Sequence, residues 1–276
     1  MSILILGAEG MLGSALMASL PTALGTTRRP WELETSGRTM TGVDITHDND
    51  LKRAFDWANP KTVINCAGVV KSECARHDSV GVTSINARAP RAIAEIARTR
   101  GARFVQVSTD CVFSGRHGNY RESDPTDAED LYGQSKAAGE VIDRQDCLTI
   151  RTSFIGRDPR RRRGLLEWLL AHEGGVVQGF TRAAWSGLSA PELARAIVLA
   201  IETPHLSGLY HVSGAPISKA DLLKVLVREL GLRCRVDLVD GDPVDRTLNG
   251  SRFVDATGYA PPGWVEMARE LNPRDT

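Results

Sequence analysis

Short apolar runs alternate with helix-length patterns through the first half of the chain, and this alternation restricts the fold more than any other feature. The runs are apolar or β-branched, are bounded by turn residues, and lie at 3–6, 23–27, 62–66, 104–108 and 148–152. Helical patterns lie between them at 11–20, 51–58, 82–100 and 132–144. Strands that are connected through helices form right-handed βαβ units, whose parallel sheet is buried on both faces. The sequence therefore predicts an α/β protein with a Rossmann-type, doubly wound parallel sheet.

The second half of the chain alternates less regularly. Three further helices and one strand are predicted, at 165–170, 191–201, 218–230 and 208–212. Ser189 is expected to cap the second of these helices, and Gly231 to end the third. We predict an NAD(P)-binding Rossmann domain over residues 1–156 and a smaller substrate-binding lobe over residues 157–276. Roughly residues 181–212 are expected to return to the first domain.

Charge and cysteine content limit the partners and the compartment. Lysine and arginine together number 34, as do aspartate and glutamate, so no net charge attracts nucleic acid or an anionic membrane. The five cysteines form no CxxC pair and no segment resembles a signal peptide, which predicts reduced thiols in the cytoplasm. The six histidines include no HExxH and no cluster with ligand spacing, so no metal site is predicted. A homodimer is left open.

A glycine-rich turn, GAEGMLG, connects the first predicted strand to the first predicted helix. Gly7, Gly10 and Gly13 allow a tight turn, a close approach of the backbone to a pyrophosphate, and close packing of the helix on the strand. The start of the helix, at Met11 and Leu12, supplies free N–H groups and the positive end of the helix dipole. The turn therefore predicts a dinucleotide site, and the alternative is a tight turn without a ligand.

The end of the second predicted strand indicates which nicotinamide dinucleotide is preferred. NAD sites usually place an acidic residue there to hold the ribose 2′-hydroxyl, whereas an arginine accommodates a 2′-phosphate. Here Thr27 is followed by Arg28 and Arg29, with no acidic residue in the run. Because arginine binds phosphate bidentately, NADPH is favoured over NAD as the cofactor. The alternative is that the two arginines are solvated loop cations.

Tyr132 opens a predicted helix, and Lys136 follows it at i+4, so the phenol and the ammonium share one helix face. A free tyrosine has a pKa near ~10, and a neighbouring cation lowers it. Thr109 stands at the end of the preceding predicted strand, and such strand ends face the ligand crevice of a doubly wound sheet. A hydroxyl at that position can hydrogen-bond the carbonyl oxygen that the phenol protonates. The alternative is an ordinary surface helix turn.

With these motifs the chain resembles the extended short-chain dehydrogenases/reductases, and among them the dTDP-4-dehydrorhamnose reductase family of sugar-nucleotide reductases. The resemblance runs nearly from end to end. It is carried by GAEGMLG at 7–13, VDIT at 43–46, NCAG at 65–68, INA around Asn86, STDCVFSG at 108–115, YGQSKAAGE at 132–140, RTSFIG at 151–156, the GLYHVSG run and RTLNGSRF at 246–253.

The resemblance implies roles for individual residues. In that family the threonine of the STD motif, the tyrosine and the lysine form the catalytic triad, which here are Thr109, Tyr132 and Lys136. The resemblance places Asp44 and Ile45 at the adenine, and it adds further cofactor contacts at Cys66, Ala67, Gly68 and Ser108. It implies substrate contacts at Val70, Cys111, Phe154 and Arg246. Arg246 matches a family position near the nucleotide diphosphate, and a structural role for it is an equal alternative.

The activity that the resemblance implies is NADPH-dependent reduction of a nucleotide-activated 4-keto-6-deoxy sugar, in deoxysugar or polysaccharide biosynthesis. The family usually has tyrosine at the position of Cys111 and tryptophan at that of Phe154, and both positions face the sugar, so the identity of the sugar is open. One alternative is an extended-family epimerase or dehydratase that recycles NAD(P). Related dehydratases carry glutamate where Cys111 stands, which favours reduction. A second alternative is a nucleotide-binding subunit without catalysis.

Three remaining features are assigned less specific roles. The run Arg160–Arg163 is interpreted as a solvated loop rather than a diphosphate clamp. Trp185 either stacks on the nucleotide base or packs at the interface of the lobe. Cys111 has no histidine nearby in the sequence, so we expect it to pack rather than to act as a nucleophile.

Overall fold

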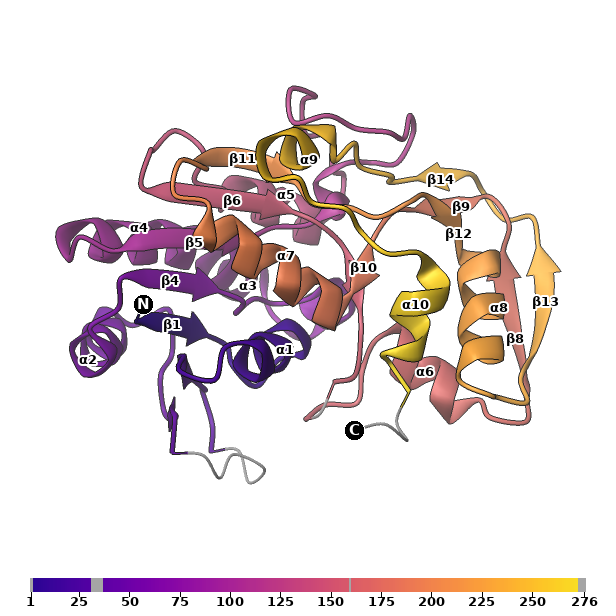
Figure 1. The fold of residues 1–276 in the computed structure, drawn as a ribbon, viewed down its shortest axis with the longest axis horizontal. Coiled ribbons are helices and arrows are strands. Elements are labelled where there is room, and N and C mark those ends of the chain that lie inside the picture. The colour runs from indigo at the N-terminus through magenta and orange to yellow at the C-terminus, as the bar shows by residue number, and fades with distance from the viewer. Residues whose placement is uncertain (1, 31–36, 159, 273–276) are drawn as a thin grey trace.

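The computed structural model describes residues 2–30, 37–158 and 160–272, and a seven-stranded parallel sheet runs through it (Figure 1). The strand order is β11-β6-β5-β4-β1-β2-β3, so the direction of winding reverses between β1 and β4, as in doubly wound folds. This confirms the predicted fold class, and the six predicted strands end within one residue of their expected bounds. The short strand β3 was not predicted. The strands are β1 (Ile3–Leu6), β2 (Leu24–Thr26), β3 (Thr39–Met40), β4 (Thr62–Asn65), β5 (Arg103–Val107), β6 (Cys147–Arg151) and β11 (Gly208–His211).

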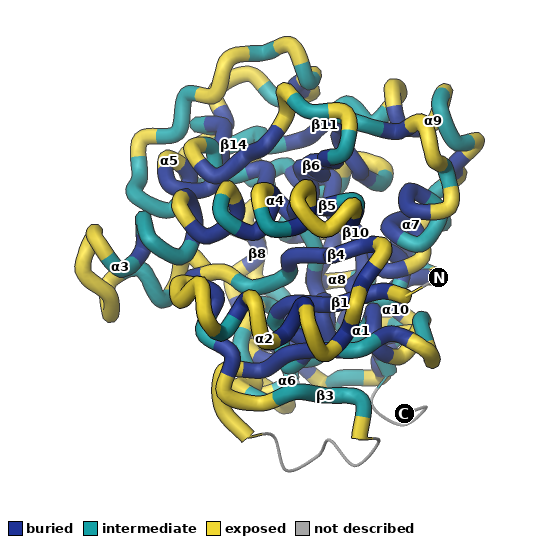
Figure 2. Tube along the Cα trace, turned by 90° about the vertical axis from the view of Figure 1, so that its left-hand side faces the viewer, coloured by how far each residue is buried: buried dark blue, intermediate teal, exposed yellow. Residues whose placement is uncertain are grey.

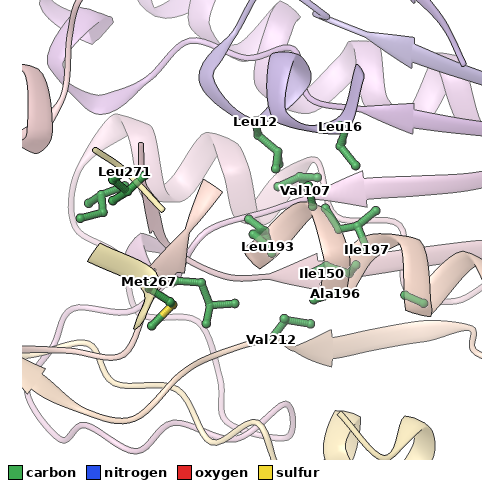
Figure 3. Close-up of a cluster of buried hydrophobic side chains, with 14 of the residues drawn as sticks. Leu12, Leu16, Val107, Ile150, Leu193, Ala196, Ile197, Val212, Met267 and Leu271 are labelled. Carbon is green, nitrogen blue, oxygen red and sulfur yellow. The ribbon is translucent and has the colours of Figure 1, made fainter. Parts of the chain in front are cut away.

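Helices cover both faces of this sheet, which explains why its strands read as continuous apolar runs (Figure 2). On one face α1 (Met11–Ser19) and α7 (Ala190–Glu202) pack against the sheet. The buried side chains there include Leu12, Leu16, Val107, Ile150, Leu193 and Ile197 (Figure 3). On the other face α2 (Asp48–Ala58) and α4 (Ala89–Thr99) bury Leu51, Phe55 and Ile93 against Leu4, Leu6 and Phe104. Successive residues of each strand therefore point into the two hydrophobic cores on opposite faces of the sheet.

The second half of the chain contributes both to this sheet and to a separate set of small sheets and helices. α7 and β11 join the central layers, and the predicted cap is present because the Ser189 hydroxyl accepts a hydrogen bond from Glu192 N at 3.2 Å. None of the helices in the described part of the chain is long and apolar enough to cross a membrane. The remaining elements are β7 (Phe154–Ile155), α6 (Leu165–Ala171), β8 (Val176–Phe180), β9 (Ala183–Trp185), β10 (Leu188–Ser189), β12 (Ile217–Ser218), α8 (Lys219–Glu229), β13 (Arg235–Val239), β14 (Val244–Asp245), α9 (Ser251–Thr257) and α10 (Trp264–Arg269).

Two helix predictions were wrong. The helix expected over 132–144 is α5 (Leu131–Ala138), which stops at Gly139. A Cβ atom on Gly139 would lie 2.0 Å from the Asn86 carbonyl oxygen. The chain at Gly139 therefore passes directly against the segment that contains Asn86, and the helix does not continue past this contact. The next residue, Glu140, then turns into the interior, where it is buried.

The long helix expected over 82–100 is divided into three parts. α3 (Ser79–Thr83) leads into a π-helical turn (Ser84–Arg88), and α4 begins at Ala89. Pro90 cannot donate a hydrogen bond to the preceding turn, and its ring clashes with a normal helical carbonyl, which accounts for the wide turn. The turn also directs the buried Asn86 side chain toward the loop after β4.

Candidate active site

The carboxyl ends of β1, β4 and β5 lie next to one another at one edge of the sheet, beside the point where the strand order reverses. Ligands of doubly wound proteins bind at this edge. The glycine turn follows β1, the segment Cys66–Gly68 follows β4, and Ser108 and Thr109 follow β5. The sequence motifs therefore converge on one place.

The glycine turn fits closely against the rest of this edge. Gly7 has φ +81°, and a Cβ atom there would lie 2.9 Å from Ala67 N, while one on Gly13 would lie 2.1 Å from the Gly7 carbonyl oxygen. A side chain is therefore excluded at both positions. At Gly10, which precedes α1, a Cβ atom would be 3.5 Å from its nearest neighbour, so the front of the turn is open to a ligand. Leu12 is buried in the core, which leaves only its backbone for such a contact.

Arg28, at the end of β2, forms an ion pair that the sequence did not suggest. Its Nε lies 3.3 Å from Oδ2 of Asp44, which comes from the segment after β3. Partial burial raises the pKa of the Asp44 carboxyl, but hydrogen bonds from Thr46 and the charge of Arg28 outweigh this effect, so the pKa is lowered. Thr27 is buried and donates to the Arg29 carbonyl oxygen at 2.8 Å. An acidic group therefore stands beside the arginines after all, supplied by a different segment.

The loop after β4 is held by Asn86. Its side chain accepts from Val69 N at 2.9 Å and donates to the Val69 carbonyl oxygen at 3.0 Å. Burial raises the pKa of the Cys66 thiol to about 12. Gly68 and the Val70 side chain are exposed, and Ile45 lies buried in the core beneath α2.

Close packing brings the tyrosine to the strand-end threonine. A Cβ atom on Gly133 would lie 2.1 Å from the Cys111 carbonyl oxygen, so α5 begins directly against the turn that follows Thr109. The Thr109 hydroxyl donates to Oδ1 of Asp110 at 3.1 Å. Burial raises the pKa of Tyr132, with the charge of Cys111 acting in the same direction, and a hydrogen bond with the Thr109 side chain opposes the rise. The phenol therefore keeps its proton at neutral pH.

Lys136 is buried one turn further along α5, and its ammonium donates to the Val107 carbonyl oxygen at 2.7 Å. Burial lowers its pKa to about 8, and the charge of Glu140 opposes that shift. The expected lowering of the Tyr132 pKa by Lys136 is not what the structure shows, because burial raises the pKa of that phenol. The ammonium instead points toward the end of β5.

A buried ion pair, which the sequence motifs contain but did not reveal, supports this edge. Glu140 accepts from Arg151 Nε and Nη2, each at 2.8 Å, and the two side chains are 5% and 4% exposed. Ser108, expected at the cofactor, donates its hydroxyl to Oε1 of Glu140 at 2.7 Å. Burial, together with the charge of Arg151, lowers the pKa of His211 to about 4, so that imidazole is neutral. The pair connects β6, β11 and the end of α5.

The expected substrate positions lie around the same turn. Cys111 is partly buried, and burial raises the pKa of its thiol to about 12, which makes it a poor nucleophile. Phe154 is half-buried in β7. Arg246 donates from Nε to the Phe113 carbonyl oxygen at 2.9 Å and from Nη2 to that of Ser114 at 3.1 Å. Arg246 therefore binds the backbone that follows the Cys111 turn, which is a structural role at the edge of the site.

The run Arg160–Arg163 is a largely exposed loop, as interpreted, but its arginines form ion pairs that the interpretation did not include. Arg160 pairs with Glu9 of the glycine turn, and Arg163 pairs with Glu73, which follows the loop after β4. Arg161 reaches both carboxylates, at 3.9 Å from Glu9 and 3.0 Å from Glu73. The run thus bridges the segments that follow β1 and β4. Glu9, the acidic residue within the glycine turn, is the sequence feature that could have indicated these ion pairs.

Trp185 packs rather than presents its ring to a ligand. It is 4% exposed, and the Trp264 ring lies 5.2 Å from it between centroids. A Cβ atom on Gly187 would lie 1.9 Å from the indole, so the ring is enclosed on that side as well. Of the two alternatives for Trp185, packing is the one observed.

Comparisons with known proteins agree with this architecture. The family described as "RmlD substrate binding domain" matches residues 1–242. The chain is 30% identical to a dTDP-4-dehydrorhamnose reductase of Burkholderia thailandensis, over 78% of this chain and 73% of that protein. It is also 30% identical to a dTDP-4-keto-6-deoxy-D-glucose reductase of Streptomyces niveus, over 83% and 78%. The crystal structure of a dTDP-4-dehydrorhamnose reductase from Bacillus anthracis in complex with NADP has the same fold, with a TM-score of 0.81, 22% identity, and coverage of 98% of this chain and 97% of that one.

Proposed function

The chain belongs to the RmlD substrate binding domain family, and we propose that it catalyses the NADPH-dependent reduction of a nucleotide-activated 4-keto-6-deoxy sugar. Relatives at 30% identity are named as reductases of this substrate class. The observation that supports the proposal best is the placement of Tyr132 beside Thr109, at the sheet edge that also contains the glycine turn. The protein is accordingly an oxidoreductase that uses a nicotinamide cofactor.

We propose Thr109, Tyr132 and Lys136 as the catalytic group. The raised pKa of Tyr132 keeps the proton on its phenol, which suits a donor to the carbonyl oxygen of the sugar. The Thr109 hydroxyl would hydrogen-bond the same oxygen and stabilise the negative charge that develops there. Lys136, with its pKa of about 8, carries a positive charge at neutral pH and would bind the nicotinamide ribose. The cofactor, when bound, supplies the hydride.

We propose that residues 1–156 bind the cofactor, through the glycine turn, the end of β2 and the segment after β4, and that residues 157–276 supply the substrate lobe. The open front of the glycine turn at Gly10 suits a pyrophosphate, because the amides that start α1 face it. A homodimer stays a prediction that light scattering would check.

The first prediction concerns the cofactor. If Arg28 or Arg29 contacts the 2′-phosphate, NADPH should bind more tightly than NADH, and Arg28→Ala with Arg29→Ala should erase most of that difference. Both side chains are exposed, so the double variant should fold normally. Fluorescence titration with both cofactors measures the effect. The single variant Arg28→Ala also breaks the ion pair with Asp44. Comparing its cofactor affinities with those of the double variant separates the effect of that ion pair from direct contact with the phosphate. Equal affinities in the parent protein would refute the preference.

The second prediction distinguishes a reductase from an epimerase or dehydratase. A reductase consumes one NADPH for each product molecule, whereas a recycling enzyme leaves the bulk cofactor unchanged. Incubation with excess NADPH and a panel of dTDP-, UDP- and GDP-linked 4-keto-6-deoxy sugars should lose absorbance in proportion to product. Product without net oxidation would move the assignment to the recycling enzymes. The neutral thiol of Cys111, at the position where dehydratases place glutamate, favours reduction.

A further inference from the structure

A row of polar side chains crosses the carboxyl ends of three neighbouring strands, directly before the catalytic threonine. Extending the register of β5 and β6 by one residue places Ser108 opposite Arg151. Arg151 in turn stands opposite His211 of β11. Residues that are paired in register on parallel strands project from the same face of the sheet, so these three side chains form one row. Thr109 is the residue that follows Ser108, and its position depends on where this row holds the strand end.

Glu140, which follows α5, binds two members of the row. Its Oε1 accepts from Ser108 Oγ at 2.7 Å and from Arg151 Nε at 2.8 Å, and its Oε2 accepts from Arg151 Nη2 at 2.8 Å. Arg151 Nη1 also lies 3.5 Å from Nε2 of the neutral His211, whose Nδ1 lies 3.0 Å from the Tyr120 carbonyl oxygen. Because a guanidinium only donates and a carbonyl only accepts, the imidazole proton is on Nδ1. One carboxylate thus connects the whole row.

Lys136, four residues before Glu140, reaches the same strand end. Its Nζ donates to the Val107 carbonyl oxygen at 2.7 Å, and Ser108, the partner of Glu140, is the next residue after Val107. The ammonium and the carboxylate therefore bind consecutive residues of β5 and its extension. The two residues are only 8% and 7% exposed, so water and salt screen their charges little. The charge of Glu140 accordingly opposes the lowering of the Lys136 pKa that burial causes.

The stability of the fold does not by itself account for a buried ion pair at this place. Apolar residues of similar size often stabilise a protein as well as such a pair, or better. A carboxylate here does have two consequences for the site. It fixes the Ser108 side chain, and a supported strand end holds the next residue, Thr109, in a defined position. It also favours the ammonium form of Lys136, which burial disfavours.

We propose that Glu140 is a positioning residue for the reaction, which acts through Lys136 and Thr109. Its carboxylate fixes Ser108, and with it the strand end that carries Thr109. It is also the counter-charge that keeps the Lys136 ammonium at that strand end. The inference rests on the proposed function, in which Lys136 binds the nicotinamide ribose and Thr109 binds the reacting oxygen.

The test measures the NADPH affinity of the parent protein and of Glu140→Gln by fluorescence titration from pH 6 to pH 9.5. The parent affinity should fall as the pH rises through about 8, because Lys136 loses its charge there. Glu140→Gln removes the charge that favours the ammonium, so the midpoint of this fall should move to lower pH by about one unit. The Tyr132 phenol and the Cys66 thiol also face this region, and their raised pKa values keep both protonated near pH 8.

Two further variants separate the charge of Glu140 from its contribution to folding. Glu140→Gln leaves the Arg151 guanidinium buried without a counter-charge, so the double variant Glu140→Gln with Arg151→Met restores stability. The charges that act on Lys136 are those of Glu140 and Cys66, so the double variant should show the same lower midpoint. Glu140→Asp keeps the charge on a shorter side chain, and its midpoint should stay close to that of the parent.

Glu192 provides the matched control. It is a buried carboxylate on α7 that accepts from Arg195 Nε at 2.7 Å and from the Tyr259 hydroxyl at 2.8 Å, outside the row. Glu192→Gln should lower the melting temperature and leave the pH midpoint of NADPH affinity unchanged. Ser108→Ala removes the hydrogen bond to Glu140 but not its charge. Its pH midpoint should also be unchanged, while turnover should slow by about tenfold because the Thr109 hydroxyl is displaced.

Other outcomes would overturn the proposal. An unmoved midpoint in the folded Glu140→Gln or double variant, or an equal shift in Glu140→Asp or Glu192→Gln, would show that the ion pair is structural. A parent affinity that does not change between pH 7 and pH 9 would show that the Lys136 charge is not used. Normal turnover in Ser108→Ala would remove the role through Thr109. The affinity measurements do not depend on turnover, so a failure of the proposed reductase activity is detected separately by the NADPH assay of the parent protein with keto sugars.

Discussion

Replacement of Tyr132 by phenylalanine is expected to lower turnover by on the order of a hundredfold or more, the scale of a lost general acid. The substitution keeps the ring that packs at the start of α5 and removes only the hydroxyl. The fold and the binding of NADPH should therefore persist, because the glycine turn and Lys136 are unchanged. Turnover is measured as NADPH oxidation with the keto sugar nucleotide, and folding by circular dichroism.

Two further variants should differ from Tyr132→Phe in kind. Thr109→Val should slow the chemical step and leave cofactor affinity alone, since it removes only a hydrogen bond to the reacting oxygen. Lys136→Ala should weaken NADPH binding as well as the rate. Near-normal turnover in a folded Tyr132→Phe protein would show that another group donates the proton, and the catalytic assignment would have to be withdrawn.

The buried pair of Glu140 and Arg151 is expected to have the largest effect on stability. Glu140→Gln removes the carboxylate that accepts two hydrogen bonds from Arg151, and it leaves a guanidinium that is 4% exposed without a counter-charge. Breaking such a pair costs about 3–5 kcal/mol of unfolding free energy. The neutral His211, 3.5 Å from Arg151 Nη1, cannot replace the lost charge. Urea unfolding, with an unchanged m-value, measures the loss.

The double variant Glu140→Gln with Arg151→Met tests the origin of that loss. Removing the second charge should recover a substantial part of the stability, because the penalty comes from an uncompensated buried charge rather than from a missing contact. Glu95→Gln provides the matched control, since Glu95 pairs with Arg98 and Arg144 at the exposed surface of α4, and it should leave the urea midpoint nearly unchanged. A single Glu140→Gln variant as stable as the parent would contradict this account.

Local patterns were sufficient to predict the central sheet and the positions of the motifs. Each predicted strand is buried on both faces, so its residues are continuously apolar, and the pattern is visible without knowledge of its neighbours. Gly7 and Gly13 are recognisable from their own turn, because the positive φ of Gly7 favours glycine and contacts with Gly7 and Ala8 exclude a side chain at Gly13. Tyr132 and Thr109 were found because a helix start and a strand end are both defined by nearby residues.

The features that only the tertiary structure decided all join segments that are distant in the chain. Asp44 meets Arg28 because β3 lies beside β2, and no property of either residue reveals that neighbour. α5 ends early because Gly139 lies close to Asn86, and Glu140 then pairs with the buried guanidinium of Arg151, eleven residues later in the chain. Propensity and periodicity report the local chain, whereas ion pairs and burial depend on which strands become neighbours, and that choice is made by the packing of the whole molecule.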